Sequence, residues 1–133
     1  MMIKRVLMAA MVALATSLTL TAPNIQAAAE VRMVTQLTGA PIIGLVPKGF
    51  AEFRSRVDAS RFKVQVQNVN LPPGTVLNVL VDNASMGLIT LSPALAGELQ
   101  LNSKDGATLP SVAPGTTVVV THPTLGTILA GVF

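Results

Sequence analysis

Short runs in which apolar and polar residues alternate recur along this 133-residue chain. In the segment Arg61 to Gln67, the residues Phe62, Val64 and Val66 are apolar, and those between them are charged or carry amides. A period of two places alternate side chains on opposite faces, so it predicts a β-strand with one face in a core. The segment Glu52 to Val57 alternates in the same way, and the two segments together predict an antiparallel hairpin.

A loop centred on Ala59-Ser60 would give this hairpin a definite register. It sets Val57 opposite Phe62 on the inner face and Arg56 opposite Lys63 on the outer face. A slip of one residue would mix the two faces, so we expect this register. The other expected pairs are Phe53 with Val66, Ser55 with Val64, and Asp58 with Arg61.

A second hairpin follows the turn residues Pro72 to Gly74, where proline fixes φ and glycine supplies a positive φ. A return turn over Asn83 to Ser85 would bring Val79 near Ile89. A shorter two-residue loop would instead set Val79 opposite Leu88. The residues expected to face inward are Leu77, Val79 and Val81 on the first strand, and Gly87, Ile89 and Leu91 on the second.

The rest of the chain continues this pattern of short strands and turns. About eight short strands at these spacings favour an all-β fold, either an antiparallel β-sandwich or a small barrel, formed as one domain over residues 30–133. Further strands are expected at Leu99 and Leu101, at Val118 and Val120, and from Ile128 to Phe133; turns at Asp105-Gly106 and Pro114-Gly115; and one helical turn over Ser92 to Gly97.

Residues 1–29 have the composition of a secretory signal peptide. Lys4 and Arg5 form a basic start, residues 6–20 are uncharged and mostly apolar, and alanines occupy positions 27–29. This order is typical of a targeting segment that is cleaved after small residues. We therefore expect an exported protein, periplasmic or extracellular, with cleavage among Ala27 to Ala29 and no membrane-spanning segment afterwards.

Loss of this segment changes the charge balance. The full chain has nine Lys and Arg against six Asp and Glu, so removing Lys4 and Arg5 leaves seven against six, a net charge of +1. A near-neutral chain without Trp or Tyr carries no electrostatic or stacking signal for nucleic acid. The chain has no cysteine, so burial alone must stabilise the exported domain.

One basic cluster lies in the predicted 52–67 hairpin and consists of Arg54, Arg56, Arg61 and Lys63. The expected register places Arg56 beside Lys63, and like charges directly opposite each other destabilise a sheet. An anionic partner, such as an acidic polysaccharide or the phosphate groups of a cell-envelope polymer, would offset that repulsion. The alternative is a solvated outer face eased by nearby acidic residues, because surface charges are usually only solvated.

Three runs within Leu37 to Phe133 resemble chordin-type (CHRD) domains: LTGAPIIGLVPKGFAEFR, NVNLPPGT and GTTVVVTHPTLGTILAGVF. The shared features are the early L-x-G, the G-x-A-x-F strand start, the glycine before the central strand and the closing G-x-x-x-x-G. The resemblance implies a Greek-key β-sandwich with a superoxide-dismutase-like layout; an immunoglobulin-like layout is the alternative. The chain is also similar to small exported bacterial β-sandwich proteins.

Metal-binding histidines are implied by the resemblance on the strand that follows LPPGT, and this chain lacks them. The corresponding positions are Val76, Val79 and Val81, whose side chains cannot bind a metal. The single histidine, His122, precedes Pro123 in an expected turn, whereas dismutase-type copper and zinc sites need several imidazoles. We expect no bound metal and no cofactor.

The chain also lacks a recognisable catalytic constellation. There is no G-x-S-x-G elbow, and the spacing of the carboxylates selects no acid–base pair. We therefore expect a non-catalytic exported module with a structural or protein-interaction role, whose partner is a protein or a cell-envelope polymer. The alternative is an anion-binding module that uses the basic face of the 52–67 hairpin.

The targeting interpretation predicts the mass of the native protein. Intact mass spectrometry of protein purified from its own cells should show a chain that begins between Ala28 and Glu30, because cleavage follows the small residues. A mature species that retains Met1 would contradict the interpretation.

Overall fold

The computed structural model describes residues 30–133, and the expected signal peptide (residues 1–29) lies outside them. The described residues form eight strands, all paired antiparallel, which confirms the all-β class and the number of strands. The strands are β1 (Val31–Thr38), β2 (Lys48–Ser55), β3 (Ser60–Gln67), β4 (Val76–Val81), β5 (Ala84–Thr90), β6 (Gly97–Asn102), β7 (Thr117–His122) and β8 (Gly126–Val132).

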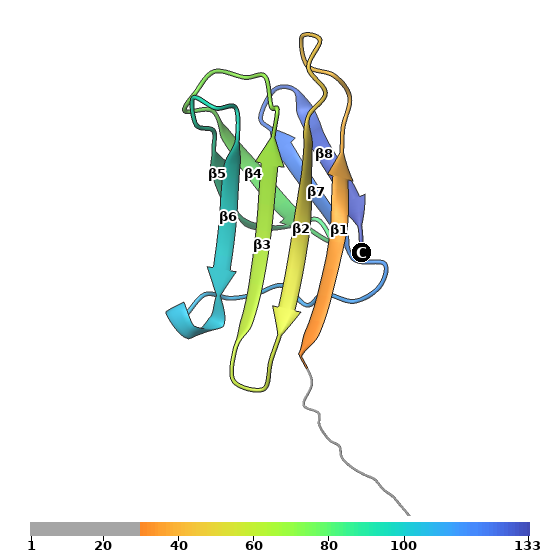
Figure 1. Ribbon diagram of the computed structural model, residues 1–133, viewed down its shortest axis with the longest axis vertical. Helices are drawn as coiled ribbons and strands as arrows, with labels where there is room; N and C mark the ends of the chain where they lie inside the picture. Colours follow the sequence, from red (N-terminus) through yellow and green to blue (C-terminus); the bar gives the residue numbers. More distant parts are fainter. Residues whose placement is uncertain (1–29) are drawn as a thin grey trace, which may run out of the picture. The chain divides into compact units, whose positions relative to one another are not determined.

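The eight strands form one sheet in the order β5-β4-β7-β8-β1-β2-β3-β6. The sheet curls so that its two halves face each other: Figure 1 shows β1, β2, β3 and β6 in front of β4, β5, β7 and β8. Strands β8 and β1 are joined by a single bridge pair, Thr38 with Ala130. The end strands β5 and β6 approach closely, because a Cβ on Gly97 would lie 3.0 Å from the carbonyl oxygen of Thr90. The sheet is therefore nearly closed.

The space between the two halves is filled by one side-chain row from each strand. Phe62, Val64 and Val66 of β3 are fully buried, as are Leu77 and Val79 of β4. The inward faces expected for these two strands are thereby confirmed. The other buried apolar residues are Leu37, Ala51, Val69, Val81, Ile89, Leu91, Val118, Val120, Ile128 and Leu129.

The register expected for the first hairpin is wrong, although the faces of β3 are right. Phe53, not Val57, lies opposite Phe62, and Arg54 lies opposite Arg61. The chain turns earlier than expected, over residues 56–59, where the Arg56 N–H donates to the Ala59 carbonyl at 2.7 Å. The expected pairing of Arg56 with Lys63, like that of Asp58 with Arg61, does not occur.

The position of Val57 explains this error. Val57 extends the apolar alternation of β2 in the sequence, yet it lies in the loop and its side chain is 89% exposed. The expected and observed partners of Phe62, Val57 and Phe53, are four residues apart. A shift by an even number of residues keeps every inward residue of a strand inward, so alternation cannot distinguish the two registers. Four residues of loop, 56–59, connect the strands, and loop length decided the pairing.

The second hairpin also differs from both registers considered. Leu77 pairs with Ile89, and Val79 with Gly87, before a bulge shifts the register after Val79. The loop consists of Asp82 and Asn83, both with positive φ (48° and 68°), as a tight turn with two left-handed residues requires. The bulge adds a residue on β5 and reconciles this short loop with the inward faces of both strands.

Two local features were misjudged from the sequence. Residues 92–97 form a turn rather than a helical turn: the Leu95 N–H donates to the Ser92 carbonyl at 3.0 Å, and Leu95 has a φ of 62°. Strand β1 was not located, because only its residue Leu37 is fully buried and its alternation is weak. It pairs with β2 along its whole length.

The inward faces generate a prediction for β4. Val79→Asp should place an unpaired carboxyl in the core and lower the free energy of unfolding by about 4 kcal/mol or more. The outward neighbour change Asn78→Asp should cost less than about 1 kcal/mol, because aspartate still accepts the hydrogen bond that Ser85 donates to Asn78. Chemical denaturation of both variants checks this. Equal losses would contradict the face assignment.

Candidate functional site

A polar row crosses the outer face of β2, β3 and β6 near one end of the sheet. Arg54 lies opposite Arg61, and Arg61 lies opposite Asn102 on the next strand. These side chains point outward because their neighbours along each strand, such as Phe62, face the core. The row therefore places two guanidinium groups on neighbouring strands, directly across from each other.

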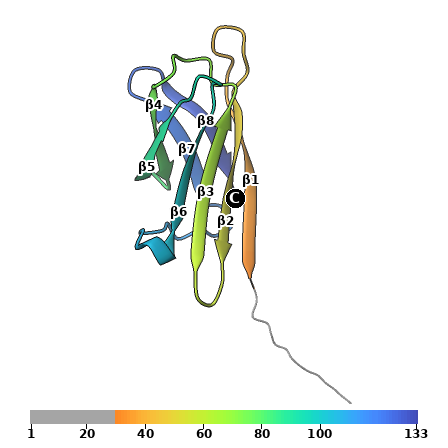
Figure 2. The ribbon, with the colours of Figure 1, turned by 60° about the vertical axis from the view of Figure 1, so that its left-hand side comes forward.

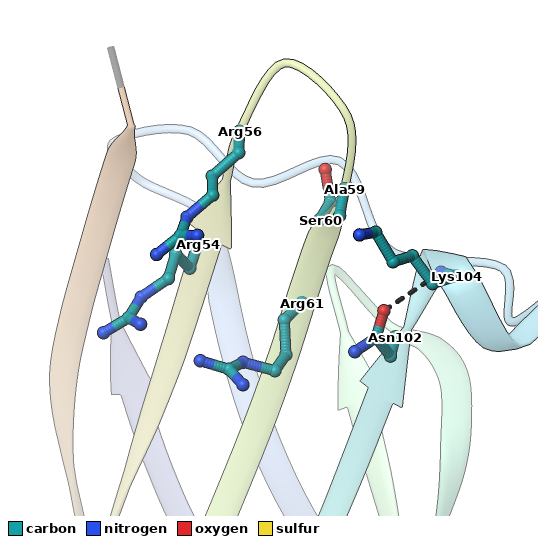
Figure 3. A pocket seen from close by; sticks show the side chains of 7 residues that line it. All are labelled: Arg54, Arg56, Ala59, Ser60, Arg61, Asn102 and Lys104. Carbon is teal, nitrogen blue, oxygen red and sulfur yellow. Dashed lines mark hydrogen bonds between the residues drawn. The ribbon is translucent and has the colours of Figure 1, made fainter. Parts of the chain in front are cut away.

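This row forms the floor of a pocket of about 220 Å³. Figure 3 shows the Arg54 and Arg56 side chains on the β2 side, Arg61 on β3 between the walls, and Asn102 and Lys104 on the β6 side. The lining residues are Arg54, Arg56, Ala59, Ser60, Arg61, Asn102 and Lys104. Four of the seven are basic and none is acidic, so the pocket suits a negatively charged group.

Lys104 is presented by a short 3-10 turn, Ser103–Asp105, that follows β6. The Asn102 side chain caps this turn by accepting a hydrogen bond from the Lys104 N–H at 3.0 Å. Gly106 ends it in the left-handed conformation, with a φ of 81°. The cap fixes the backbone of Lys104 at the rim of the pocket.

Two hydrogen bonds of Ser60 hold the two walls of the pocket together. The Ser60 N–H, at the start of β3, donates to Ser103 Oγ at 2.8 Å. Ser60 Oγ in turn donates to Ser55 Oγ at 3.3 Å. The hairpin loop and the 3-10 turn are thereby joined, although residues 60 and 103 are far apart in sequence.

Acidic side chains balance part of this charge from outside the pocket. Glu52 accepts hydrogen bonds from Arg32 and, at 3.4 Å, from Arg54. The Arg32 hydrogen bond, aided by the charges of Arg54 and Lys63, lowers the pKa of Glu52 below its ordinary value, although burial acts in the opposite direction. Its side chain is only 13% exposed, which keeps these interactions from being fully screened.

The opposite wall has a weaker counter-charge. Lys104 Nζ lies 3.6 Å from Asp58 Oδ2, and both side chains are more than half exposed, at 63% and 71%. Exposed pairs of this kind contribute little to stability. Within residues 30–133 the structure gives Arg61 no ion pair. Arg61 is therefore the pocket cation with the least local compensation.

Three of the four basic residues selected from the sequence meet in this pocket, and one does not. Lys63 lies opposite Glu52 and sits 5.8 Å from the centre of the Phe50 ring, away from the pocket. Lys104 belongs to the pocket and was missed. The only sequence signal for it is the stretch Asn102 to Gly106, which has a cap residue at its start and a glycine at its end.

The positions that correspond to metal ligands in the resembled families have other surroundings here. Val79 and Val81 are buried in the core, whereas Val76 is 41% exposed. His122 ends β7, and its Nδ1 accepts hydrogen bonds from the N–H groups of Thr124 and Leu125, both at 3.2 Å. The ring thus stabilises the β7–β8 turn. Across residues 30–133, no group of three or more His, Cys, Asp or Glu could hold a metal ion.

Comparison with known proteins adds no relative. A scan of protein-family models, a search of curated protein sequences and a search of solved structures returned no match. Among the described residues, no helix has the length and apolar character needed to cross a membrane. The candidate site therefore rests on its own geometry.

The lowered pKa of Glu52 generates a pH prediction. A carboxylate with a lowered pKa stabilises the fold at pH values above its ordinary pKa of 4.5. This stabilisation is lost as the pH falls through the pKa of the folded state. Glu52→Gln should therefore lower the free energy of unfolding by about 1 kcal/mol at neutral pH and by less in acid.

Denaturation of the parent and of Glu52→Gln, from neutral pH down through the acid range in which carboxyl groups titrate, measures this difference. The same pair of measurements in an Arg32→Gln background is the control, because it removes the main cause of the lowered pKa. A difference that stays constant down to the lowest pH would contradict the assignment.

Proposed function

We propose that this protein is an exported, non-catalytic module that binds anionic groups of a larger polymer in the basic pocket of β2, β3 and β6. The observation that carries the proposal is the direct opposition of Arg54 and Arg61, with Lys104 at the rim. Like charges placed directly across a sheet destabilise it. A bound anion would offset that repulsion, because it attracts both guanidinium groups.

The chemistry of the pocket favours phosphate or sulfate esters and carboxylates. Guanidinium groups bind such anions through two parallel hydrogen bonds, which a single ammonium cannot reproduce. The pocket, at about 220 Å³, is smaller than the roughly 300–1,000 Å³ of a site that encloses a drug-sized ligand. It suits one charged group of a chain whose remainder stays in solvent, such as an acidic polysaccharide or a phosphate-bearing envelope polymer.

The order of the strands supports a more specific proposal about the layout of the fold. Strand β7 follows β6 after a long connection, residues 103–116, and lies beside the earlier strand β4. A return of this kind is compatible with a Greek key. We therefore propose a Greek-key layout of the superoxide-dismutase-like kind, as the resemblance to CHRD domains implies, without a metal site. Export to the periplasm or the cell exterior remains part of the proposal.

A structural or protein-interaction role is the second candidate, and strand β1 favours it. Its bridge to β8 is a single pair at Thr38. Among residues 30–133, the edge of β1 that faces β8 therefore has no partner strand from Val31 to Val34. Val31 and Val34 are also 51% and 45% exposed. An open apolar edge of this kind can accept a strand from another protein.

Removal of two pocket charges tests anion binding. Arg61→Gln with Lys104→Gln should reduce affinity for dextran sulfate by about tenfold or more, because charge-assisted hydrogen bonds are lost. Lys48→Gln with Lys63→Gln removes the same charge outside the pocket and is the matched control, with affinity expected within about twofold of the parent at physiological salt.

Binding is measured by titration at about 150 mM salt, where the screening length of roughly 8 Å suppresses non-specific attraction. An alginate titration in parallel separates sulfate esters from carboxylates. If the parent binds neither polymer, or if both double variants lose affinity equally, the pocket is not an anion site. The strand-edge role would then be the remaining candidate.

A further inference from the structure

Charge is divided unequally between the two halves of the sheet. The seven charged residues that lie within strands all belong to β1, β2, β3 and β6. Strands β4, β5, β7 and β8 contain no Lys, Arg, Asp or Glu. The half that carries the basic pocket is therefore charged on its outer face, and the other half is not. The charged strand residues are Arg32, Lys48, Glu52, Arg54, Arg61, Lys63 and Glu98.

The outer face of the second half is also apolar, and we call it the uncharged face. Leu88 and Val132 are 60% and 57% exposed there, although outward positions of a solvated sheet are usually polar. On β4 and β7 the outward side chains alternate with buried ones. Leu88 of β5 and Ala130 of β8 lie opposite outward residues of these strands and therefore share their face. Its apolar members are Val76, Leu80, Leu88, Val119, Ala130 and Val132.

Three of these residues are neighbours across the strands, and the other three lie opposite neutral polar residues. Leu80 lies opposite Val119, and Val119 lies opposite Ala130 on the next strand. Asn78 lies opposite both Leu88 and Thr121, so neutral hydrogen-bonding groups sit among the apolar ones. Figure 2 shows β5, β4, β7 and β8 as the layer on the other side of the core from β3.

The extent of the uncharged face is sufficient for a weak interface. The four strands lie about 4.8 Å apart, and each has about six residues with a rise of about 3.3 Å per residue. These dimensions give a face of roughly 400 Å². Its apolar members cover part of that area, and the largest apolar patch on a typical monomer, about 300–600 Å², is often functional. Two such faces in contact would bury about 800 Å², which is below the area of stable specific interfaces and fits a weak, reversible complex.

A second copy of this chain is the occupant that these properties fit. Any partner must lack charge at its contact surface, because a charge buried against Leu80 and Val119 would lose its solvation without compensation. The charged half of the protein cannot meet that condition. The uncharged face meets it except at its end, where the Asp82 carboxylate accepts a hydrogen bond from the outward Thr117 hydroxyl at 3.3 Å. Two sheets can pack face to face about 10 Å apart with their side chains interdigitated. We propose that the protein dimerises back to back through this face.

The arrangement has a consequence for the anion pocket, and this step rests on the proposed function. The pocket and the uncharged face lie on opposite halves of the sheet, so the dimer would present two pockets on opposite outer sides. Two weak sites on one body bind a polymer with higher apparent affinity than one site. They could also connect two polymer chains.

Light scattering after size-exclusion chromatography tests the dimer across a concentration series. The parent should pass from monomer to dimer as concentration rises. Leu88→Arg should remain monomeric at every concentration, because it places a charge in the interface without touching the core. Ile43→Arg is the matched control: it adds the same side chain at an 86% exposed loop position and should dimerise like the parent.

The outcomes separate this proposal from anion binding. A parent that is monomeric throughout would overturn self-association and assign the face to a different uncharged partner. A dimer that Leu88→Arg leaves intact would overturn the choice of face, provided that its melting temperature shows a folded protein. The Arg61→Gln, Lys104→Gln variant should still dimerise, so loss of binding and loss of dimerisation are measured independently.

Discussion

Burial of one face of the curled sheet is the constraint on which the rest of this structure depends. The sheet has no disulfide and no helix over residues 30–133 to cover its inner surface, so its two halves must cover each other. Each strand contributes one row of side chains to that shared core, and residues such as Phe62 and Val79 are completely enclosed. Burying such a side chain stabilises the fold by roughly 1.5–3 kcal/mol. The outward rows are then free to differ between the halves.

That freedom separates the two chemical characters of the molecule. On β3 the residues between the buried ones are basic or amide-bearing, so Arg61 can take part in a pocket at no cost to the core. On β4 and β7 the corresponding residues are uncharged, and Leu80 and Val119 among them are apolar. Both patterns satisfy the inner surface equally well. The proposed anion site and the proposed dimer face are therefore independent uses of one scaffold.

The sequence was a reliable guide to which side chains face inward and a poor one to which residues pair. The inward set of β3 and β4 was predicted because a one-residue error would expose the core and is energetically expensive. Both hairpin registers were wrong because a shift by an even number of residues, four in the first hairpin and two in the second, leaves the faces unchanged. Loop geometry decides between such registers, through the early turn that exposes Val57 and through the left-handed residues Asp82 and Asn83.

The same limit applies to the candidate site. The sequence places Arg54 and Arg61 on the outer rows of one hairpin, a local property, and the structure brings them opposite each other. Lys104 was missed because it reaches the pocket through the pairing of β6 with β3 and through the bond between Ser60 and Ser103. Contacts between segments so far apart in the chain leave no periodic signal. They follow from topology, which alternation does not encode.

The single bridge between β8 and β1 has a mechanical consequence. Apart from the Thr38–Ala130 pair, the seam is held by the Thr35 hydroxyl, which donates to the Val132 carbonyl at 2.8 Å. Regions with few backbone hydrogen bonds open at a lower free energy than the whole fold. We therefore expect this seam to open more readily than the fully paired strands. The pocket residues lie on β2, β3 and β6, with full strand pairing between them and the seam, so transient opening there leaves their geometry intact.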